Sequence, residues 1–364
     1  MSLTIQNGNL MVYYCFDIAN EIKLDKVEKV FGKKPETSEL VVERLTPEYI
    51  RHRVPPLLVR MGKVKIGKTE FIVKAKIYDF GVVTIIFVSK LRGKLNDLKK
   101  LSQKIASSKV LPKEARKFLE KIKQEIEPSM ERHKIQVEEF FEDFLIFKVN
   151  KFYQKTKIPD LLKDHGKNIA KALRCDAGNL SENEIQDAIK NPLSYYEDDL
   201  VVVDWNAAFI YDKKESYDLI DVLEYALIES LELRTYDTVL DIVLEKAYTD
   251  ISNIKKFSLY PHSKTISYLT EVKVEISDII EKVSNLIKLI GDVYLAKVYA
   301  SASERFYMNE WRKSVEKKLD TIESIYSTIS GRTWDRRLLL VEVFMTALFV
   351  VWFALEMTLL LLGK

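Results

Sequence analysis

The stretch RRLLLVEVFMTALFVVWFALEMTLLLLGK, residues 336–364, decides how the chain is organised. Between Leu338 and Leu362 its 25 residues include only two charged side chains, Glu342 and Glu356. As one α-helix they would be about 37 Å long, whereas the hydrocarbon core of a membrane is about 30 Å thick. The stretch therefore predicts a C-terminal membrane anchor.

A helix buried in a soluble oligomer is the alternative. The run free of charge, Val343 to Leu355, is only 13 residues long, which is typical of a core helix. Each Leu, Val or Phe favours insertion by about 0.3–0.6 kcal/mol, and an acidic residue costs about 3 kcal/mol at mid-membrane but less near an end. Because Glu342 and Glu356 lie near the ends, the balance favours insertion.

The polar side chains of the anchor fall on one face. Fourteen residues separate the two glutamates, which places them within about 40° of each other on a helix. Carboxylates inside a membrane usually face protein, and small residues at four- and seven-residue spacing allow a second helix to approach. The predicted interaction face comprises Glu342, Thr346, Ala347, Ala354, Glu356 and Thr358.

The flanks of the anchor predict its orientation. Arg332, Arg336 and Arg337 precede it and only Lys364 comes after it, so the positive-inside rule leaves the N-terminal bulk in the cytoplasm. The first residues, MSLTIQNGNL, have neither the pattern of a signal peptide nor that of a mitochondrial presequence. We expect a tail-anchored, single-pass protein of a prokaryotic cell membrane.

Upstream of the anchor, residues 213–335 have helical periodicity. Two segments repeat apolar residues in steps of four and three, separated by the polar stretch SASERFYMNE, residues 301–310. This spacing predicts an antiparallel, coiled-coil-like hairpin and a homo-oligomer. The predicted seam consists of Ile276, Ile280, Val283, Ile287, Ile290 and Tyr294 on one helix, and Trp311, Val315, Leu319 and Ile322 on the other.

Residues 1–212 predict an α+β domain. Strand patterns are followed by a lysine-rich helical zone with proline breaks at Pro112 and Pro128, and then by further strands and helices. Ser181 and Glu184 form a capping box that predicts the start of a short helix. The expected strands are 10–18, 57–61, 71–78, 82–88, 140–153, 200–203 and 207–211, and the expected helices are 24–31, 91–134 and 158–173.

One stretch fits the phosphate-loop pattern G-x-x-x-x-G-K-[ST], with Asp204 after an apolar run as the matching magnesium ligand. A phosphate loop requires a helix after its lysine. Residues 71–78, FIVKAKIY, instead alternate as a strand, so we favour a β-hairpin over nucleotide binding. The residues of the disfavoured nucleotide site are Gly62, Gly67, Lys68, Thr69 and Asp204.

Other patterns predict no catalysis. Asp79, Phe80 and Gly81 spell the kinase magnesium triplet, but no His-Arg-Asp loop precedes them, so we expect a turn. The four histidines are scattered, and two distant cysteines make no zinc motif. A net charge of +3 gives no reason to expect a sequence-specific nucleic-acid partner. We expect no cofactor, no metal and no enzymatic activity.

Four stretches carry a family resemblance: residues 77–89, 193–212, 226–237, and the run from Val293 to Glu342. In these the chain resembles the required-for-meiotic-nuclear-division and YagE-like family, a domain of unknown function. The resemblance implies an α+β N-terminal part, a helical C-terminal part with one membrane helix, large homo-oligomers, and a tethering role in translation. It supplies no catalytic residues.

Three functions remain as hypotheses. The first is a non-enzymatic, membrane-anchored scaffold that assembles through its hairpin and anchor and presents the α+β domain to a protein partner. The second is a membrane tether for a ribosome or RNA, bound by the basic helices around Lys94 to Lys123. The third is a nucleotide-dependent enzyme using Lys68 and Asp204.

Overall fold

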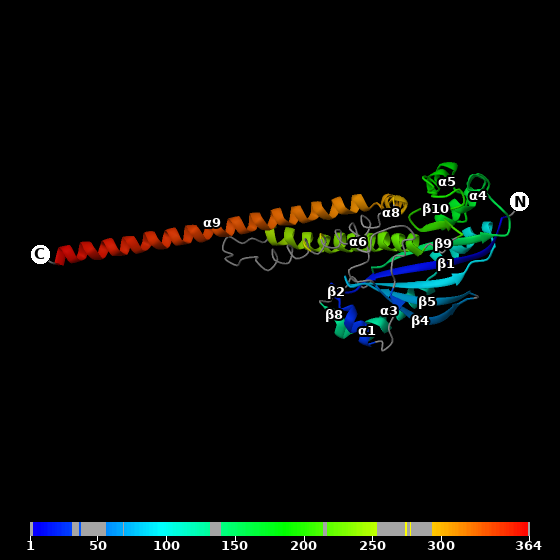
Figure 1. Cartoon of the computed structure of the whole chain (residues 1–364). Coiled ribbons are helices and arrows are strands. Elements are labelled where there is room, and N and C mark those ends of the chain that lie inside the picture. The colour runs from blue at the N-terminus through cyan, green and yellow to red at the C-terminus, as the bar shows by residue number, and fades with distance from the viewer. Residues whose placement is uncertain are drawn as a thin grey trace. The chain divides into compact units, whose positions relative to one another are not determined.

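The computed structural model describes residues 3–30, 36–37, 56–67, 69–131, 140–213, 217–252, 274, 277 and 293–362 (Figure 1). The chain forms two compact units. Unit 1 comprises Met1–Thr235 and Asp278–Trp311, and unit 2 comprises Tyr236–Ser277 and Arg312–Lys364.

A nine-stranded sheet forms the centre of unit 1. Its order is β10-β11-β9-β1-β6-β5-β4-β3, and β7 pairs with one end of β1. Neighbouring strands are antiparallel except β11 and β9, which are parallel. The strands are β1 (Thr4–Asp17), β3 (Glu36–Thr37), β4 (Leu57–Ile66), β5 (Thr69–Ile77), β6 (Val82–Lys90), β7 (Gly93–Lys94), β9 (Glu142–Phe152), β10 (Leu200–Val203) and β11 (Ala207–Tyr211). A separate small ribbon pairs β2 (Glu21–Ile22) with β8 (Met130–Glu131).

Both faces of the sheet are apolar because successive side chains of a strand point to opposite faces. On β1, Val12 and Tyr14 belong to one core, whereas Met11 and Tyr13 belong to the other. Helices therefore cover the sheet on both sides, and the central strands read as continuous apolar runs.

The first face packs against the lysine-rich helices and their neighbours. Pro112 lies in the first turn of a helix, where proline is tolerated, so the chain breaks at residues 107–109 instead of at that proline. Ser181 caps its helix as predicted, accepting a hydrogen bond from the Glu184 N–H at 3.2 Å. The helices are α1 (Leu24–Val30), α2 (Leu98–Ala106), α3 (Val110–Ile126), α4 (Ile158–Leu173) and α5 (Glu182–Ala188), with 3-10 turns at Leu95–Asp97 and Glu127–Ser129.

The predicted turn between β5 and β6 is confirmed, and it requires glycine. Gly81 has φ +96°, and a Cβ there would lie 1.6 Å from the carbonyl oxygen of Ala19. The Gly81 carbonyl accepts hydrogen bonds from the N–H groups of Ile18 and Ala19. The Asp-Phe-Gly triplet is therefore a tight turn packed against the end of β1.

The second face of the sheet packs against the first half of α6 (Tyr217–Ser252) and against α8 (Val293–Arg305). The expected polar turn over residues 301–310 is shorter than predicted. Helix α8 continues to Arg305, and α9 (Met308–Leu362) begins after Phe306 and Tyr307. Tyr307 makes the reversal with φ 55°, a left-handed conformation rare for a residue with a side chain.

In unit 2, the second half of α6 runs parallel to α9. Lys318 Nζ lies 2.9 Å from Asp237 and 2.6 Å from Asp241, and Ser314 donates to Asp237 at 2.6 Å. The buried side chains recur in steps of three, four or seven residues on both helices, so each helix buries one side. They are Tyr236, Leu240 and Ala247 on α6, and Val315, Leu319, Ile322 and Tyr326 on α9.

The C-terminal part of α9 confirms the predicted apolar helix. The segment Leu338–Thr358 has a mean hydropathy of 2.5, and none of it is buried. It is the one helix among the described residues long and apolar enough to cross a membrane. Residues 331–335 continue the same helix, so α9 runs without a break into the apolar segment.

Candidate functional site

Unit 1 contains a cavity of about 310 Å³ at the end of the sheet where the parallel strands β9 and β11 begin. Its lining combines acidic, basic and aromatic side chains from five parts of the chain. We call it the Trp205–Trp311 cavity. It is lined by Glu142, Asp143, Trp205, Asn206, Leu227, Ser230, Arg234, Arg305, Phe306, Tyr307 and Trp311.

An ion pair joins two sides of this cavity. The Arg234 guanidinium, on α6, donates to Glu142 at the start of β9. The same guanidinium lies 5.4 Å from the ring centre of Phe140 and 5.7 Å from that of Trp311. Arg234 thus links the first turn of α9 to the sheet through charge and through cation–π contact.

Burial raises the pKa of Glu142 to about 7, despite the opposing effect of Arg234, and the neighbouring Asp143 raises it further. Burial also raises the pKa of Asp143 from its usual value, against the effects of its own backbone N–H and of Arg234. Glu142 therefore changes charge near neutral pH, inside a wall of the cavity.

Replacing Glu142 with glutamine is expected to change how stability depends on pH. The folded pKa of about 7 exceeds the usual value of 4.5, so the folded state holds an extra proton between these values. The proton on Glu142 stabilises the folded state fully below pH 4.5. This stabilisation is lost as pH rises to 7, and the loss is about 3 kcal/mol at most. The wild-type thermal midpoint should therefore fall relative to that of Glu142→Gln across this range.

Thermal unfolding in detergent from pH 4.5 to 7.5 measures this difference. Glu120→Gln, on the exposed surface of α3, is the matched control and should behave like the wild type. A midpoint difference between wild type and Glu142→Gln that stays constant with pH would contradict the assignment.

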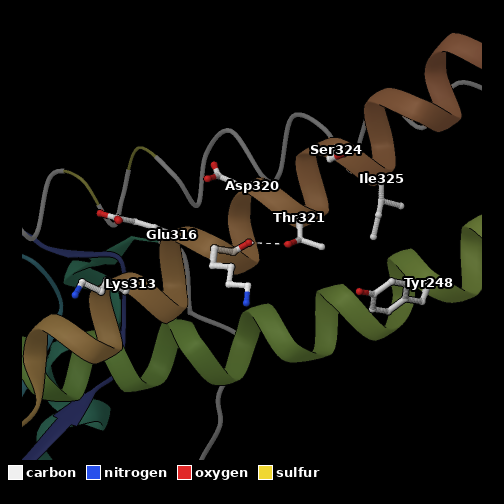
Figure 2. A pocket seen from close by; sticks show the side chains of 8 residues that line it. Tyr248, Lys313, Glu316, Asp320, Thr321, Ser324 and Ile325 are labelled. Carbon is white, nitrogen blue, oxygen red and sulfur yellow. Dashed lines mark hydrogen bonds between the residues drawn. The ribbon is translucent and has the colours of Figure 1, made fainter.

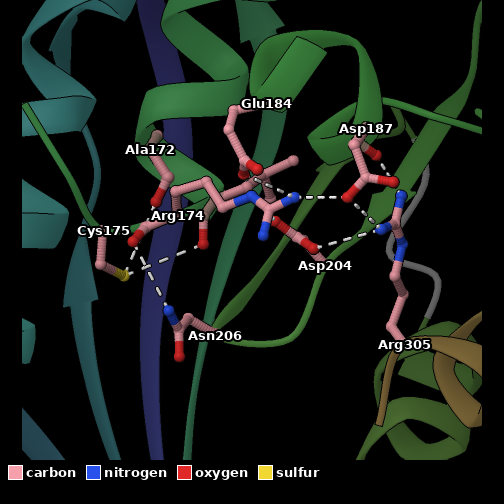
Figure 3. Close-up of polar contacts among 9 residues, drawn as sticks. Ala172, Arg174, Cys175, Glu184, Asp187, Asp204, Asn206 and Arg305 are labelled. Atoms are coloured by element: carbon pink, nitrogen blue, oxygen red, sulfur yellow. Dashed lines mark hydrogen bonds and ion pairs between the residues drawn. The ribbon is translucent and has the colours of Figure 1, made fainter. Parts of the chain in front are cut away.

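A second charge network lies beside the cavity (Figure 3). Arg174, which ends α4, lies with Nη2 2.5 Å from Asp187 and with Nε 3.0 Å from Asp204. Arg305, which ends α8, lies 3.0 Å from the same carboxylate of Asp187 and 3.6 Å from Asp204. Glu184 on α5 is 3.5 Å from Arg174. Two arginines thereby hold α4, α5, α8 and the β10–β11 turn together.

The pKa values of the two aspartates of this network are shifted in opposite directions. Burial raises the pKa of the fully buried Asp204 from its usual value, against both arginines. Burial acts in the same direction on Asp187, but hydrogen bonds from Arg305 and Arg174 outweigh it and lower its pKa. The Arg174 guanidinium also stacks 3.8 Å from the ring centre of Trp205, which fixes this wall of the cavity.

A third cluster is buried between the sheet and α6. Lys76 Nζ on β5 lies 2.6 Å from Asp221 and 2.7 Å from Glu224, and the Tyr78 hydroxyl donates to Glu224 at 2.7 Å. Burial lowers the pKa of Lys76, but the two carboxylates outweigh it and raise the pKa overall. This cluster lines no cavity described in the structure, so we interpret it as structural.

The structure places Asp204 far from the other described residues of the disfavoured nucleotide site. Gly62 and Thr69 lie in the β4–β5 hairpin, with Gly67 at its turn, and a strand comes next where a phosphate loop requires a helix. Lys68 lies outside the described residues. Asp204 comes directly after β10, at the opposite edge of the sheet from β4, and pairs with arginines.

The predicted coiled-coil residues divide between the two units. Val315, Leu319 and Ile322 are buried in unit 2, whereas Tyr294 and Trp311 pack against the second core of unit 1. Among the described residues of unit 2, the helix that packs against α9 is α6. Ile276, Ile280, Val283, Ile287 and Ile290 lie outside the described residues, so the predicted hairpin partner does as well.

The predicted interaction face of the anchor is exposed along α9. Thr346 donates to the Glu342 carbonyl oxygen at 2.7 Å, and Thr358 donates to the Leu355 carbonyl oxygen at 2.8 Å. Both hydroxyls are therefore satisfied within the helix. Glu342 and Glu356 remain as the polar side chains that need a partner in a membrane, while Ala347 and Ala354 leave room beside them.

A groove of about 590 Å³ lies in unit 2 between Tyr248 on α6 and one side of α9 (Figure 2). Lysines and acids alternate along the α9 side, and Thr321 donates to the Lys317 carbonyl oxygen at 2.7 Å. Among the residues that the structure describes, no group of three or more His, Cys, Asp or Glu side chains could hold a metal ion.

The fold defines the structural class of the protein. It is an α/β protein with one sheet covered by helices on both faces, followed by a C-terminal apolar helix. The chain belongs to the family described as "Uncharacterized protein MJ0711, N-terminal domain", whose model matches residues 7–218. That match includes β1 from residue 7, the other strands of the sheet and helices α1 to α5. The match does not show the required-for-meiotic-nuclear-division and YagE-like family, so that resemblance stays a hypothesis.

One relative is the uncharacterized protein MJ0711 of Methanocaldococcus jannaschii. It is 27% identical over 196 residues, which are 53% of this chain and 59% of the relative. The match therefore spans less than two thirds of the relative. No solved structure matches the chain.

Sequence reasoning missed most of the cavity. It considered Asp204, which lies beside the cavity and pairs with Arg305, only as a magnesium ligand of the disfavoured nucleotide site, and it placed Arg305 in a polar turn. The signal that could have drawn attention to the site is the sequence Asp-Trp-Asn at residues 204–206, directly after a fully apolar strand.

Proposed function

We propose that the protein is a non-enzymatic, single-pass membrane protein that self-associates and holds its sheet-containing unit at the cytoplasmic surface of the cell membrane, where that unit binds a protein partner. The observation that carries the proposal is the segment Leu338–Thr358, which is apolar and wholly exposed. An apolar helix of this length would aggregate in water, whereas the lipid tails of a membrane solvate its apolar side chains.

Self-association is supported by the polar groups that the apolar segment leaves unsatisfied. Glu342 and Glu356 project from one side of α9, and carboxylates inside a membrane are costly unless they meet protein. The alanines and threonines beside them allow close approach of another helix. A second copy of the chain offers the same face in return, as a symmetric dimer requires.

Replacing Glu342 and Glu356 with leucine tests this proposal. Insertion should be kept or improved, because two costs of up to about 3 kcal/mol are removed. The oligomer should weaken, because the polar contacts between helices are lost. Analytical ultracentrifugation in detergent measures the oligomer, and extraction of membranes at alkaline pH measures insertion.

The matched control is Val343→Leu with Met357→Leu, which changes the neighbours of both glutamates on other sides of the helix. It should leave the oligomer intact. If the glutamate variant assembles as well as the control, the two carboxylates are merely tolerated. A wild-type protein that is monomeric in detergent would remove self-association from the proposal.

A second candidate function is a tether for a ribosome or RNA. It is supported by the row of exposed basic side chains on and before α2 and α3, and by the implied translation role of the resembled family. These exposed side chains include Arg92, Lys94, Lys100, Lys104, Lys109, Lys113, Lys117 and Lys121. Co-sedimentation with ribosomes should weaken steeply as salt rises and should fail when these lysines are changed to glutamate.

A further inference from the structure

The charges around the Trp205–Trp311 cavity do not balance. Arg305 is neutralised by Asp187 and Asp204, and Arg234 is neutralised by Glu142. An incoming anion would have to displace these carboxylates from their arginines. The two networks hold three arginines, Arg174, Arg234 and Arg305, against four carboxylates, Glu142, Glu184, Asp187 and Asp204, and Asp143 in the cavity lining adds a fifth.

Asp143 is the carboxylate in the cavity lining that makes no ion pair with any described residue. Its side chain is exposed, next to the Glu142–Arg234 pair at the start of β9. A cation that enters the cavity can therefore reach this carboxylate and donate a charge-assisted hydrogen bond to it without displacing an arginine.

The rest of the lining suits an apolar stem on that cation. Trp205 and Tyr307 are 44% and 56% exposed, although large aromatic side chains are usually covered. Phe306, Trp311 and Leu227 complete the apolar wall. Tyr307 is held in the left-handed region, a strained backbone conformation that tends to occur at binding sites. Aromatic rings also attract cations through their faces.

We propose that the Trp205–Trp311 cavity binds an organic cation: an ammonium group on an aliphatic stem that pairs with Asp143 while the stem packs against the aromatic wall. A lysine side chain of a partner protein and a free aliphatic amine share this chemistry. The site goes beyond the proposed anchoring function and does not depend on it, because all of its residues belong to unit 1.

The experiment uses the full-length protein in detergent, labelled with 5-fluorotryptophan. The chain has four tryptophans, and two of them, Trp205 and Trp311, line the cavity. Their fluorine resonances are assigned with the Trp205→Phe and Trp311→Phe variants. n-Butylammonium and N-acetyl-lysine methylamide are titrated separately, and n-butanol serves as the neutral probe.

A saturable shift of the Trp205 or Trp311 resonance with an amine, and none with n-butanol, supports the proposal. Asp143→Asn should weaken this binding about tenfold or more, because it removes a charge-assisted hydrogen bond. Asp160→Asn, an exposed acid on α4, should leave it unchanged. Binding of both amines indicates a partner's lysine, whereas binding of n-butylammonium alone indicates a free amine.

No saturable shift with either amine overturns the proposal, as does equal binding by the Asp143→Asn variant or by n-butanol. The spectrum of each variant without ligand shows whether the fold is kept. Since the readout is confined to unit 1, failure here would leave the anchoring proposal untouched, and failure of anchoring would leave this binding unchanged.

Discussion

The Lys76→Met variant is expected to unfold at a much lower temperature than the wild type. Lys76 is the cation that pairs with both Asp221 and Glu224 in the core between the sheet and α6. Removing one partner of a buried charge cluster leaves uncompensated charge and costs about 3–5 kcal/mol. For a unit of this size that corresponds to a fall of about 10 °C or more in the thermal midpoint.

The loss should depend on pH in a defined direction. Burial already raises the pKa of Glu224, partly offset by Lys76. Without the lysine this pKa rises further, so the folded state takes up a proton that the unfolded state does not. Stability of the variant is then retained at low pH and is lost as pH rises through the folded pKa. The deficit should be larger at pH 8 than at pH 5.

Two controls make this result specific. Lys63→Met removes an exposed ion pair with Glu70 in the β4–β5 hairpin and should cost almost nothing. The triple variant Lys76→Met, Asp221→Asn and Glu224→Gln should recover part of the loss, because no net charge then remains buried. If Lys76→Met is as stable as Lys63→Met at pH 8, the cluster does not stabilise the unit.

Deletion of residues 338–362 is expected to move the protein from the membrane fraction to the soluble fraction. The deleted segment contains the whole candidate span and none of the buried residues described in α9. The cores of both units should therefore remain intact. Alkaline extraction of membranes, followed by assay of the pellet and supernatant, measures the change.

A length-preserving variant separates the membrane from mere truncation. Phe349→Arg with Val350→Arg places two charges near the middle of the span, at about 3 kcal/mol each. This variant should also leave the membrane, whereas Phe349→Leu with Val350→Ile should stay in it. Wild-type protein found entirely in the alkaline supernatant would instead favour the buried-helix alternative.

The sequence predicted the strands and helices of unit 1 well where one pattern dominates. Leu200–Val203 and Ala207–Tyr211 were expected as strands and form β10 and β11. β1 was expected only from residue 10, but it begins at Thr4. Its first residues are mostly polar and have no strand pattern. They form a strand because their backbone pairs with β9 and β7, and no local sequence pattern reveals that pairing.

The cavity could not be predicted because tertiary structure assembles it. Its charged residues, such as Glu142, Arg234 and Arg305, are separated by many tens of residues, and each looks like an ordinary surface residue in its own helix or strand. The pairing of α6 with α9 escaped prediction for a similar reason. Heptad spacing shows that a helix has an apolar seam, but not which of several helices covers it.

The place of β1 in the sheet has a consequence for synthesis of the protein on the ribosome. β1 is made early, yet its neighbours β6 and β9 lie some 70 and 135 residues further along the chain. Until β9 has emerged, a strand that is apolar on both faces has an open edge, which is the kind of surface that aggregates. Newly made chains therefore pass through a stage in which the central strand has not yet been covered on both of its edges.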